Sequence, residues 1–212
     1  MFDFMKTVNY KLIELFFLFV LIPISFTINY LPILKLSIGV LGFVYVLYVL
    51  FKVEKIQFKI RKDIHWKDFW RTTFLKFLVI AIVTTLFVWF TDNDSFFNVV
   101  LHKPIKWLLI LFFYAAFSVY PQELLYRTFY FKRYKNLFKN ERLFIFINAI
   151  LFSLAHLFFK NSIVIAITFI GGLLFAITYN KTKSTFLVSI EHALYGCWLF
   201  TVGMGSMLGF PT

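Results

Sequence analysis

The run IVIAITFIGGLLFAITY, residues 163–179, contains no charged side chain and decides the fold class of this chain. A helix that crosses a membrane needs roughly 20 mostly apolar residues, and this run with its flanking residues reaches that length. The pattern recurs along the sequence and predicts seven membrane-spanning helices. The seven runs are Leu12–Ile28, Ile33–Phe51, Thr72–Phe90, Ile105–Tyr120, Leu143–Phe159, Ile163–Tyr179 and Thr185–Met204.

The composition supports the same class. The 212 residues are 61% hydrophobic and 23% aromatic, and only 15% are charged. These values are typical of an integral membrane protein and exclude an ordinary soluble enzyme. Because the seven runs use most of the chain, no sizeable soluble domain fits beside them. We therefore predict one domain, residues 1–212, that forms an all-α, multi-pass transmembrane bundle of about seven spans.

The distribution of positive charge predicts the orientation in the bilayer. The formal net charge of +12 gathers in alternate connections between the runs, whereas the connections between them carry few basic residues. Under the positive-inside rule this pattern places the N-terminus in the cytoplasm and the C-terminus outside. The surplus matches anionic lipid, so we expect the bilayer, and no nucleic acid, as its partner. The basic connections hold Lys52, Lys55, Lys59, Arg61, Lys62, Lys67 and Arg71, then Lys132, Arg133, Lys135, Lys139 and Arg142, then Lys181 and Lys183.

Glu123, His156 and His192 are ionisable residues that lie within the apolar runs or their continuations. Such side chains are costly inside a bilayer and usually mark a functional site. At 1.5 Å per residue, Glu123 lies about 13 Å, His192 about 12 Å and His156 about 20 Å from the cytoplasmic boundaries of their helices. We therefore expect these helices to bring the three residues to one polar cavity. Glu14, by contrast, lies one turn into the first run beside Lys11, and we expect it to reach the membrane surface.

Glu123 and Arg127 are four residues apart and share a helix face, so the guanidinium can hold the carboxylate ionised. Pro121 is expected to kink the helix at this point. A carboxylate beside two imidazoles is a plausible general acid–base set for activating water. The alternative is structural, because polar clusters inside membranes also join helices to one another.

These residues resemble the motifs of a known family, the CAAX prenyl protease and bacteriocin-processing (CPBP) intramembrane proteases. The stretch QELLYR, residues 122–127, resembles the motif EExxxR, and FSLAH, residues 152–156, fits FxxxH. His192 begins a third motif, HxxxN. The resemblance covers roughly Lys103–Gly203. It implies a glutamic-type intramembrane endopeptidase in the bacterial plasma membrane, which needs no cofactor or metal and acts on a membrane-embedded or lipid-modified peptide.

Two positions depart from the family pattern. Gln122 replaces the first glutamate and cannot accept a proton, and Gly196 replaces the asparagine of the third motif. We expect Glu123 to act as the base with His156, and Gln122 and His192 to donate hydrogen bonds to the developing oxyanion. Glu191 projects about 100° away from His192 on a helix and is expected to be a buried supporting residue.

Three other interpretations stay open at this stage. The chain could be a relative that binds membrane peptides without cleaving them, as the two departures suggest. It could be a small transporter, although no similar halves are visible. It could also be a metalloprotease, because two His and one Glu form a familiar ligand set, although the motif HExxH is absent.

Overall fold

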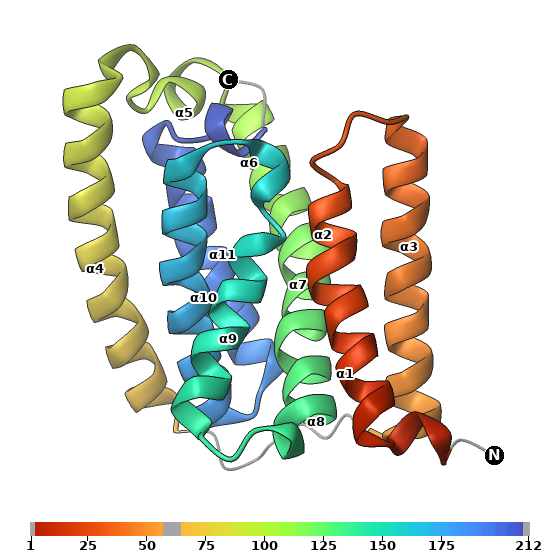
Figure 1. Ribbon diagram of the computed structural model, residues 1–212. Coiled ribbons are helices and arrows are strands. Elements are labelled where there is room, and N and C mark those ends of the chain that lie inside the picture. The colour runs from red at the N-terminus through yellow and green to blue at the C-terminus, as the bar shows by residue number, and fades with distance from the viewer. Residues whose placement is uncertain (1–2, 57–64, 210–212) are drawn as a thin grey trace. The chain divides into compact units, whose positions relative to one another are not determined.

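The computed structural model describes residues 3–56 and 65–209, and in this part of the chain all regular structure is helical (Figure 1). Seven helical segments are long and apolar enough to cross a membrane, which confirms the predicted all-α, multi-pass fold: Val8–Ser25, Pro32–Val53, Trp66–Thr91, Pro104–Leu137, Glu141–Phe159, Ser162–Thr182 and Thr185–Val202. The α-helices are α1 (Val8–Phe16), α2 (Ile22–Ser25), α3 (Pro32–Tyr48), α4 (Trp66–Thr91), α5 (Asn98–His102), α6 (Pro104–Phe113), α7 (Tyr120–Glu123), α8 (Tyr130–Tyr134), α9 (Glu141–Leu154), α10 (Ser162–Thr182) and α11 (Thr185–Val202).

The fourth spanning segment continues through Pro121, as the expected depth of Glu123 requires. Its 34 residues, Pro104–Leu137, include π-helical turns at Tyr114–Val119 and Leu124–Phe129. A proline lacks the N–H for a helical hydrogen bond and crowds the carbonyl four residues before it. Wider π-helical turns beside the proline relieve this conflict, and such turns often occur at functional sites. The apolar run therefore predicted the existence of the helix but not its full length.

The chain forms two compact units, and each contains two separate stretches of sequence. Unit 1 consists of Met1–Ile60 and Leu124–Lys183, and unit 2 of Arg61–Glu123 and Ser184–Thr212. The boundary between the units lies between Glu123 and Leu124, so the first motif is divided between them. The second motif lies in unit 1, and the third in unit 2. One domain for the whole chain stays a prediction.

Helices α9 and α10 form a tightly packed pair in unit 1, and they lie side by side in Figure 1. Asn140 and Asn161 cap their N-termini, each through a side-chain oxygen that accepts from two backbone N–H groups. A Cβ atom on Gly172 would lie 3.1 Å from Cα of Ala149, so glycine permits the close approach of the two backbones. Small residues commonly allow such contact between membrane helices.

A buried polar cluster in unit 1 corrects the prediction for Glu14. Glu14 is only 6% exposed, and its Oε2 lies 2.7 Å from Nε of Arg133. Arg133 also contacts Glu54 at 2.8 Å and donates to the carbonyl oxygen of Met5 at 2.6 Å. A charged side chain inside a membrane protein needs such partners, because an isolated buried charge is costly. Glu14 is therefore buried against Arg133 and is not an exposed side chain.

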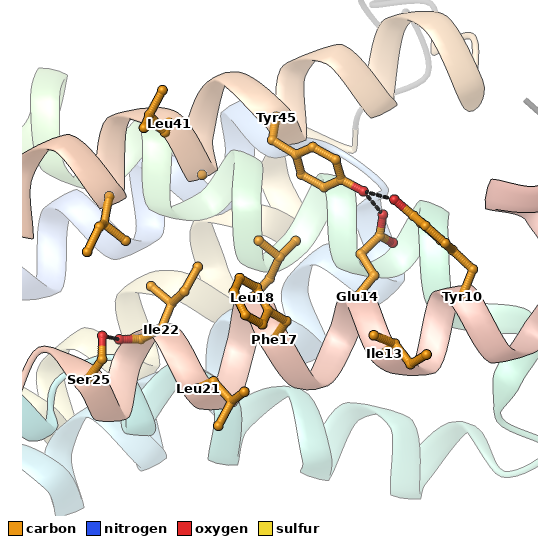
Figure 2. Close-up of a pocket in the computed structure, with 12 residues that line it drawn as sticks. Tyr10, Ile13, Glu14, Phe17, Leu18, Leu21, Ile22, Ser25, Leu41 and Tyr45 are labelled. Carbon is orange, nitrogen blue, oxygen red and sulfur yellow. Dashed lines mark hydrogen bonds between the residues drawn. The ribbon is translucent and has the colours of Figure 1, made fainter.

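The same cluster forms the polar end of an apolar groove between α1 and α3. Figure 2 shows Glu14 and Tyr10 hydrogen-bonded to the hydroxyl of Tyr45 at this end. The groove has a volume of about 620 Å³ and is lined mainly by apolar side chains, which include Leu18 and Leu41. It contains none of the residues that the sequence predicted as catalytic.

In unit 2, α4 and α11 are held together by hydrogen bonds along their length. The hydroxyl of Tyr195 donates to the carbonyl oxygen of Thr73, and Nε1 of Trp198 donates to the hydroxyl of Thr84. Helix α11 ends at Val202 and is capped by Gly203, whose φ of +119° is accessible mainly to glycine. These contacts fix α11, which carries the third sequence motif, against its neighbour.

Candidate active site

Glu123 and His192 form a buried pair in unit 2. Nδ1 of His192 lies 2.8 Å from Oε1 of Glu123, and the carboxylate side chain is fully buried. Glu123 is the last residue of α7, and His192 lies in α11, in the second turn after its Ser184 cap. An ionised carboxylate only accepts hydrogen bonds, so Nδ1 carries the proton in this contact. The contact fixes the imidazole ring and directs Nε2 away from Glu123.

Gln122 contacts its own helical segment. Its Nε2 donates to the hydroxyl oxygen of Ser118 at 2.7 Å. Its Oε1 is buried and has no hydrogen-bond partner within residues 3–56 and 65–209. The described contact therefore orients the amide through Ser118, whereas its predicted role toward an oxyanion stays a prediction.

Glu191 lies beside His192 in sequence but has different partners. Its Oε1 lies 2.7 Å from Nζ of Lys76 in α4 and accepts from the hydroxyl of Tyr195 at 2.9 Å. Glu191 is fully buried, as the helical projection predicts for a supporting residue. Lys76 was not among the predicted site residues, although a lysine within the apolar run Thr72–Phe90 is itself a signal of a buried partner.

Tyr114 is a second residue that was not among the predicted site residues. Its ring lies edge-on to the rings of His192 and Phe200, at centroid distances of 6.0 and 4.7 Å. A Cβ atom on Gly196 would overlap the Tyr114 hydroxyl and two of its ring carbons. Glycine at this position therefore makes room for the tyrosine. Sequence alone offers no signal for this pairing, because 82 positions separate the two residues.

Arg127 lies in unit 1, where Asn148 and Phe152 are among its contacts. One of its terminal nitrogens, Nη1, donates to Oδ1 of Asn148 at 2.5 Å. Its guanidinium carbon lies 4.8 Å from the ring centroid of Phe152, a cation–π distance. Asn148 in turn donates to the carbonyl oxygen of Tyr126 at 2.8 Å. Arg127 is thus held in a fixed position, and its predicted pairing with Glu123 stays a prediction.

His156 also lies in unit 1, and its local structure differs from the prediction. Helix α9 ends at Leu154, so His156 occupies the turn after the helix and not a position within it. Its Nδ1 lies 2.8 Å from the carbonyl oxygen of Phe152. A carbonyl oxygen only accepts hydrogen bonds, so Nδ1 is the donor in this contact. The ring also contacts Phe152 and Phe159. A turn was not expected because the apolar run continues without interruption to Phe159.

The structure thus pairs Glu123 with His192 in unit 2. Gln122 lies in the same unit but contacts Ser118, and Arg127 and His156 lie in unit 1. The meeting of all five residues stays a prediction. No group of three His, Cys, Asp or Glu residues that could hold a metal ion is found in the described part of the chain. Whether activity depends on a metal ion can be tested with a chelator.

The comparisons with known proteins agree with the motifs. The family model for type II CAAX prenyl endopeptidases of the Rce1-like kind matches residues 104–198, which confirms the resemblance to the CPBP proteases. The matched segment begins at the first residue of α6 and ends within α11, and it includes all five predicted site residues. Among curated proteins and among solved structures no match was found.

Proposed function

From the similarity of residues 104–198 to the Rce1-like CAAX prenyl endopeptidases, we propose that this membrane protein is an active intramembrane glutamic endopeptidase. Its substrate would be a membrane-embedded or lipid-modified peptide. The observation that carries the proposal is the buried contact between Glu123 and His192, at 2.8 Å. A carboxylate held by a histidine and removed from bulk water can act as a general base.

In the proposed mechanism, Glu123 takes a proton from water as the water oxygen attacks the peptide carbonyl. His192 donates to Oε1 and orients the carboxylate, so that Oε2 receives the proton. His156 is the second histidine at the water, and its contact with the carbonyl of Phe152 supports this role because it fixes the ring. The proton then passes to the amine that leaves when the C–N bond breaks.

Arg127 and Gln122 have supporting roles in this proposal. Arg127 supplies a positive charge near the carboxylate, and its contacts with Asn148 and Phe152 hold it in place. Gln122 presents a neutral amide where the family pattern has a glutamate, so one carboxylate performs the proton transfer. The proposal requires units 1 and 2 to bring His156 and Arg127 to Glu123.

The proposed location is the bacterial plasma membrane, with the N-terminus in the cytoplasm and the C-terminus outside. The basic connections support this orientation through the positive-inside rule. Within unit 1, Arg133 contacts Met5 near the N-terminus, whereas α2 contacts the turn Leu157–Phe159. Connections that carry many basic residues and connections that carry few therefore lie at different ends of this unit.

The test is cleavage by the purified protein in detergent or lipid. Substrates would be a prenylated peptide and a panel of membrane peptides, each assayed with and without a chelator. We expect cleavage that Glu123→Gln abolishes and that chelation leaves unchanged. Glu141→Gln, at an exposed position, is the matched control and should retain activity. Activity that disappears with chelator and returns with zinc would instead support the metalloprotease interpretation.

A second candidate is a non-catalytic relative that binds membrane peptides. Gln122 favours it, because its amide cannot replace the carboxylate of the first motif position and is held by Ser118. This candidate predicts that the same peptides bind to the wild-type protein without being cleaved. Movement of a solute across vesicles with no peptide binding would support a transporter instead.

A further inference from the structure

The space beside Gly196 in unit 2 is occupied by the hydroxyl end of Tyr114. A side chain that begins with a Cβ atom at position 196 would overlap this hydroxyl. The backbone of Gly196 lies within the helix α11, so glycine matters here for its lack of a side chain. The two residues are therefore matched, since one leaves the space that the other fills.

Tyr114 lies along the face of α11 that carries His192. His192, Gly196 and Phe200 follow one another at four-residue intervals and share one face of the helix. The Tyr114 ring contacts the first and last of these by edge-on packing, and its hydroxyl reaches the glycine between them. The hydroxyl is thus held about one helical turn from the histidine that binds Glu123.

We infer that the Tyr114 hydroxyl donates a hydrogen bond to the oxyanion that forms when water adds to the scissile carbonyl. This inference rests on the proposed protease function. A phenol O–H is a hydrogen-bond donor, and a fixed donor at a developing negative charge stabilises the transition state. The hydroxyl keeps its proton, whereas the water proton goes to Glu123 and then to the leaving amine. Tyr114 thereby places a donor, from the fourth spanning segment, in the space that a side chain at position 196 would occupy.

Packing alone is the alternative role for Tyr114, and it makes a different prediction. Phenylalanine has the same ring and would preserve the edge-on contacts with His192 and Phe200. If the ring alone matters, Tyr114→Phe should be active. If the hydroxyl matters, this variant should fold normally and react slowly.

The experiment compares kcat and KM for the wild-type protein, Tyr114→Phe and Tyr120→Phe, with a membrane peptide that the wild-type protein cleaves. Tyr120 is the matched control, because it lies in the same spanning segment but is exposed. We expect Tyr114→Phe to lower kcat by about 10²–10³, the usual effect of losing one oxyanion donor, with KM unchanged. Tyr120→Phe should retain the wild-type kcat. Equal loss in both variants, or a kcat for Tyr114→Phe within about twofold of wild type, would overturn the inference.

A compensating pair of substitutions tests the same idea without relying on one variant. Tyr114→Ala empties the space beside position 196, and Gly196→Asn then places an amide donor there. The double variant should have a kcat about tenfold higher than that of Tyr114→Ala alone. If the double variant folds but its kcat is no higher than that of Tyr114→Ala, the inferred donor beside position 196 is wrong.

The outcomes separate the two proposals. If the wild-type protein cleaves and Tyr114→Phe cleaves equally well, only the role of Tyr114 is wrong. If the wild-type protein binds the peptides and cleaves none of them, the proposed function is wrong, and the role of Tyr114 falls with it.

Discussion

Nζ of Lys76 lies 2.7 Å from Oε1 of Glu191, which joins α4 to the residue immediately before His192. Glu191 is fully buried and Lys76 is mostly buried, so the two charges neutralise each other where water is scarce. The pair holds the part of α11 that presents His192 to Glu123. It is therefore expected to affect both stability and activity.

Removing only one member of this pair should be worse than removing both. Lys76→Met leaves a buried carboxylate without its counter-charge and should destabilise the protein by about 3 kcal/mol. Lys76→Met with Glu191→Gln should recover much of this loss, because no buried charge remains. Thermal unfolding in detergent measures both effects. Losses that simply add would show that the two side chains do not depend on each other.

Arg133 should be essential for folding, although no catalytic role is expected for it. It contacts both Glu14 and Glu54, so Arg133→Leu leaves two carboxylates at a buried site and should cost at least about 3–5 kcal/mol. Lys132→Leu removes a neighbouring positive charge from an exposed position and is the control. The yield of monodisperse protein and the unfolding temperature should fall for the first variant only. Similar behaviour of the two variants would argue against the cluster.

Gln122→Glu tests which carboxylate does the chemistry. If Glu123 is the base, a second negative charge beside it favours a shared proton and should lower activity near neutral pH. Ser118 can donate to the new carboxylate, so the variant should fold. The rate of peptide cleavage between pH 5 and 8 is the measurement. A large gain in cleavage would show that the native chain is a weakened relative and that the assignment of Glu123 is wrong.

The orientation in the membrane can be tested by labelling single cysteines in a Cys197→Ser background. Lys139→Cys lies in a basic connection and should react only from the cytoplasmic side. Asp94→Cys lies in a connection with few basic residues and should react only from outside. Both positions are exposed, so poor access is no obstacle. Equal labelling from one side would refute the predicted orientation.

The sequence predicted the spans well because a bilayer constrains them strongly. An apolar run such as Ile163–Tyr179 can satisfy its backbone inside a membrane only as a helix, and the structure has α10 at Ser162–Thr182. The ends were less accurate. Apolar character did not reveal that α9 stops at Leu154, or that π-helical turns carry the fourth segment through Pro121 to Leu137.

The site could be predicted only where a costly residue marked it. Glu123 and His192 were visible as polar residues in apolar surroundings, and the structure pairs them. The matching of Tyr114 with Gly196 could not be predicted, because a tyrosine in an apolar run and a glycine in a helix are both ordinary. Glu14 was assigned to the surface because its partner Arg133 lies 119 positions away in sequence. Contacts of this kind depend on tertiary packing, which local pattern does not encode.

The most direct test of the central claim is the activity of Glu123→Gln, His156→Ala and the double variant against one cleaved membrane peptide. Residues that act on the same water are strongly non-additive. Each single substitution should therefore lower kcat by at least about 10³, and the double variant should be no slower than the slower single variant. All three proteins should unfold at temperatures close to that of the wild type. Independent losses that multiply in the double variant, or normal cleavage by Glu123→Gln, would contradict the proposal that Glu123 and His156 activate one water.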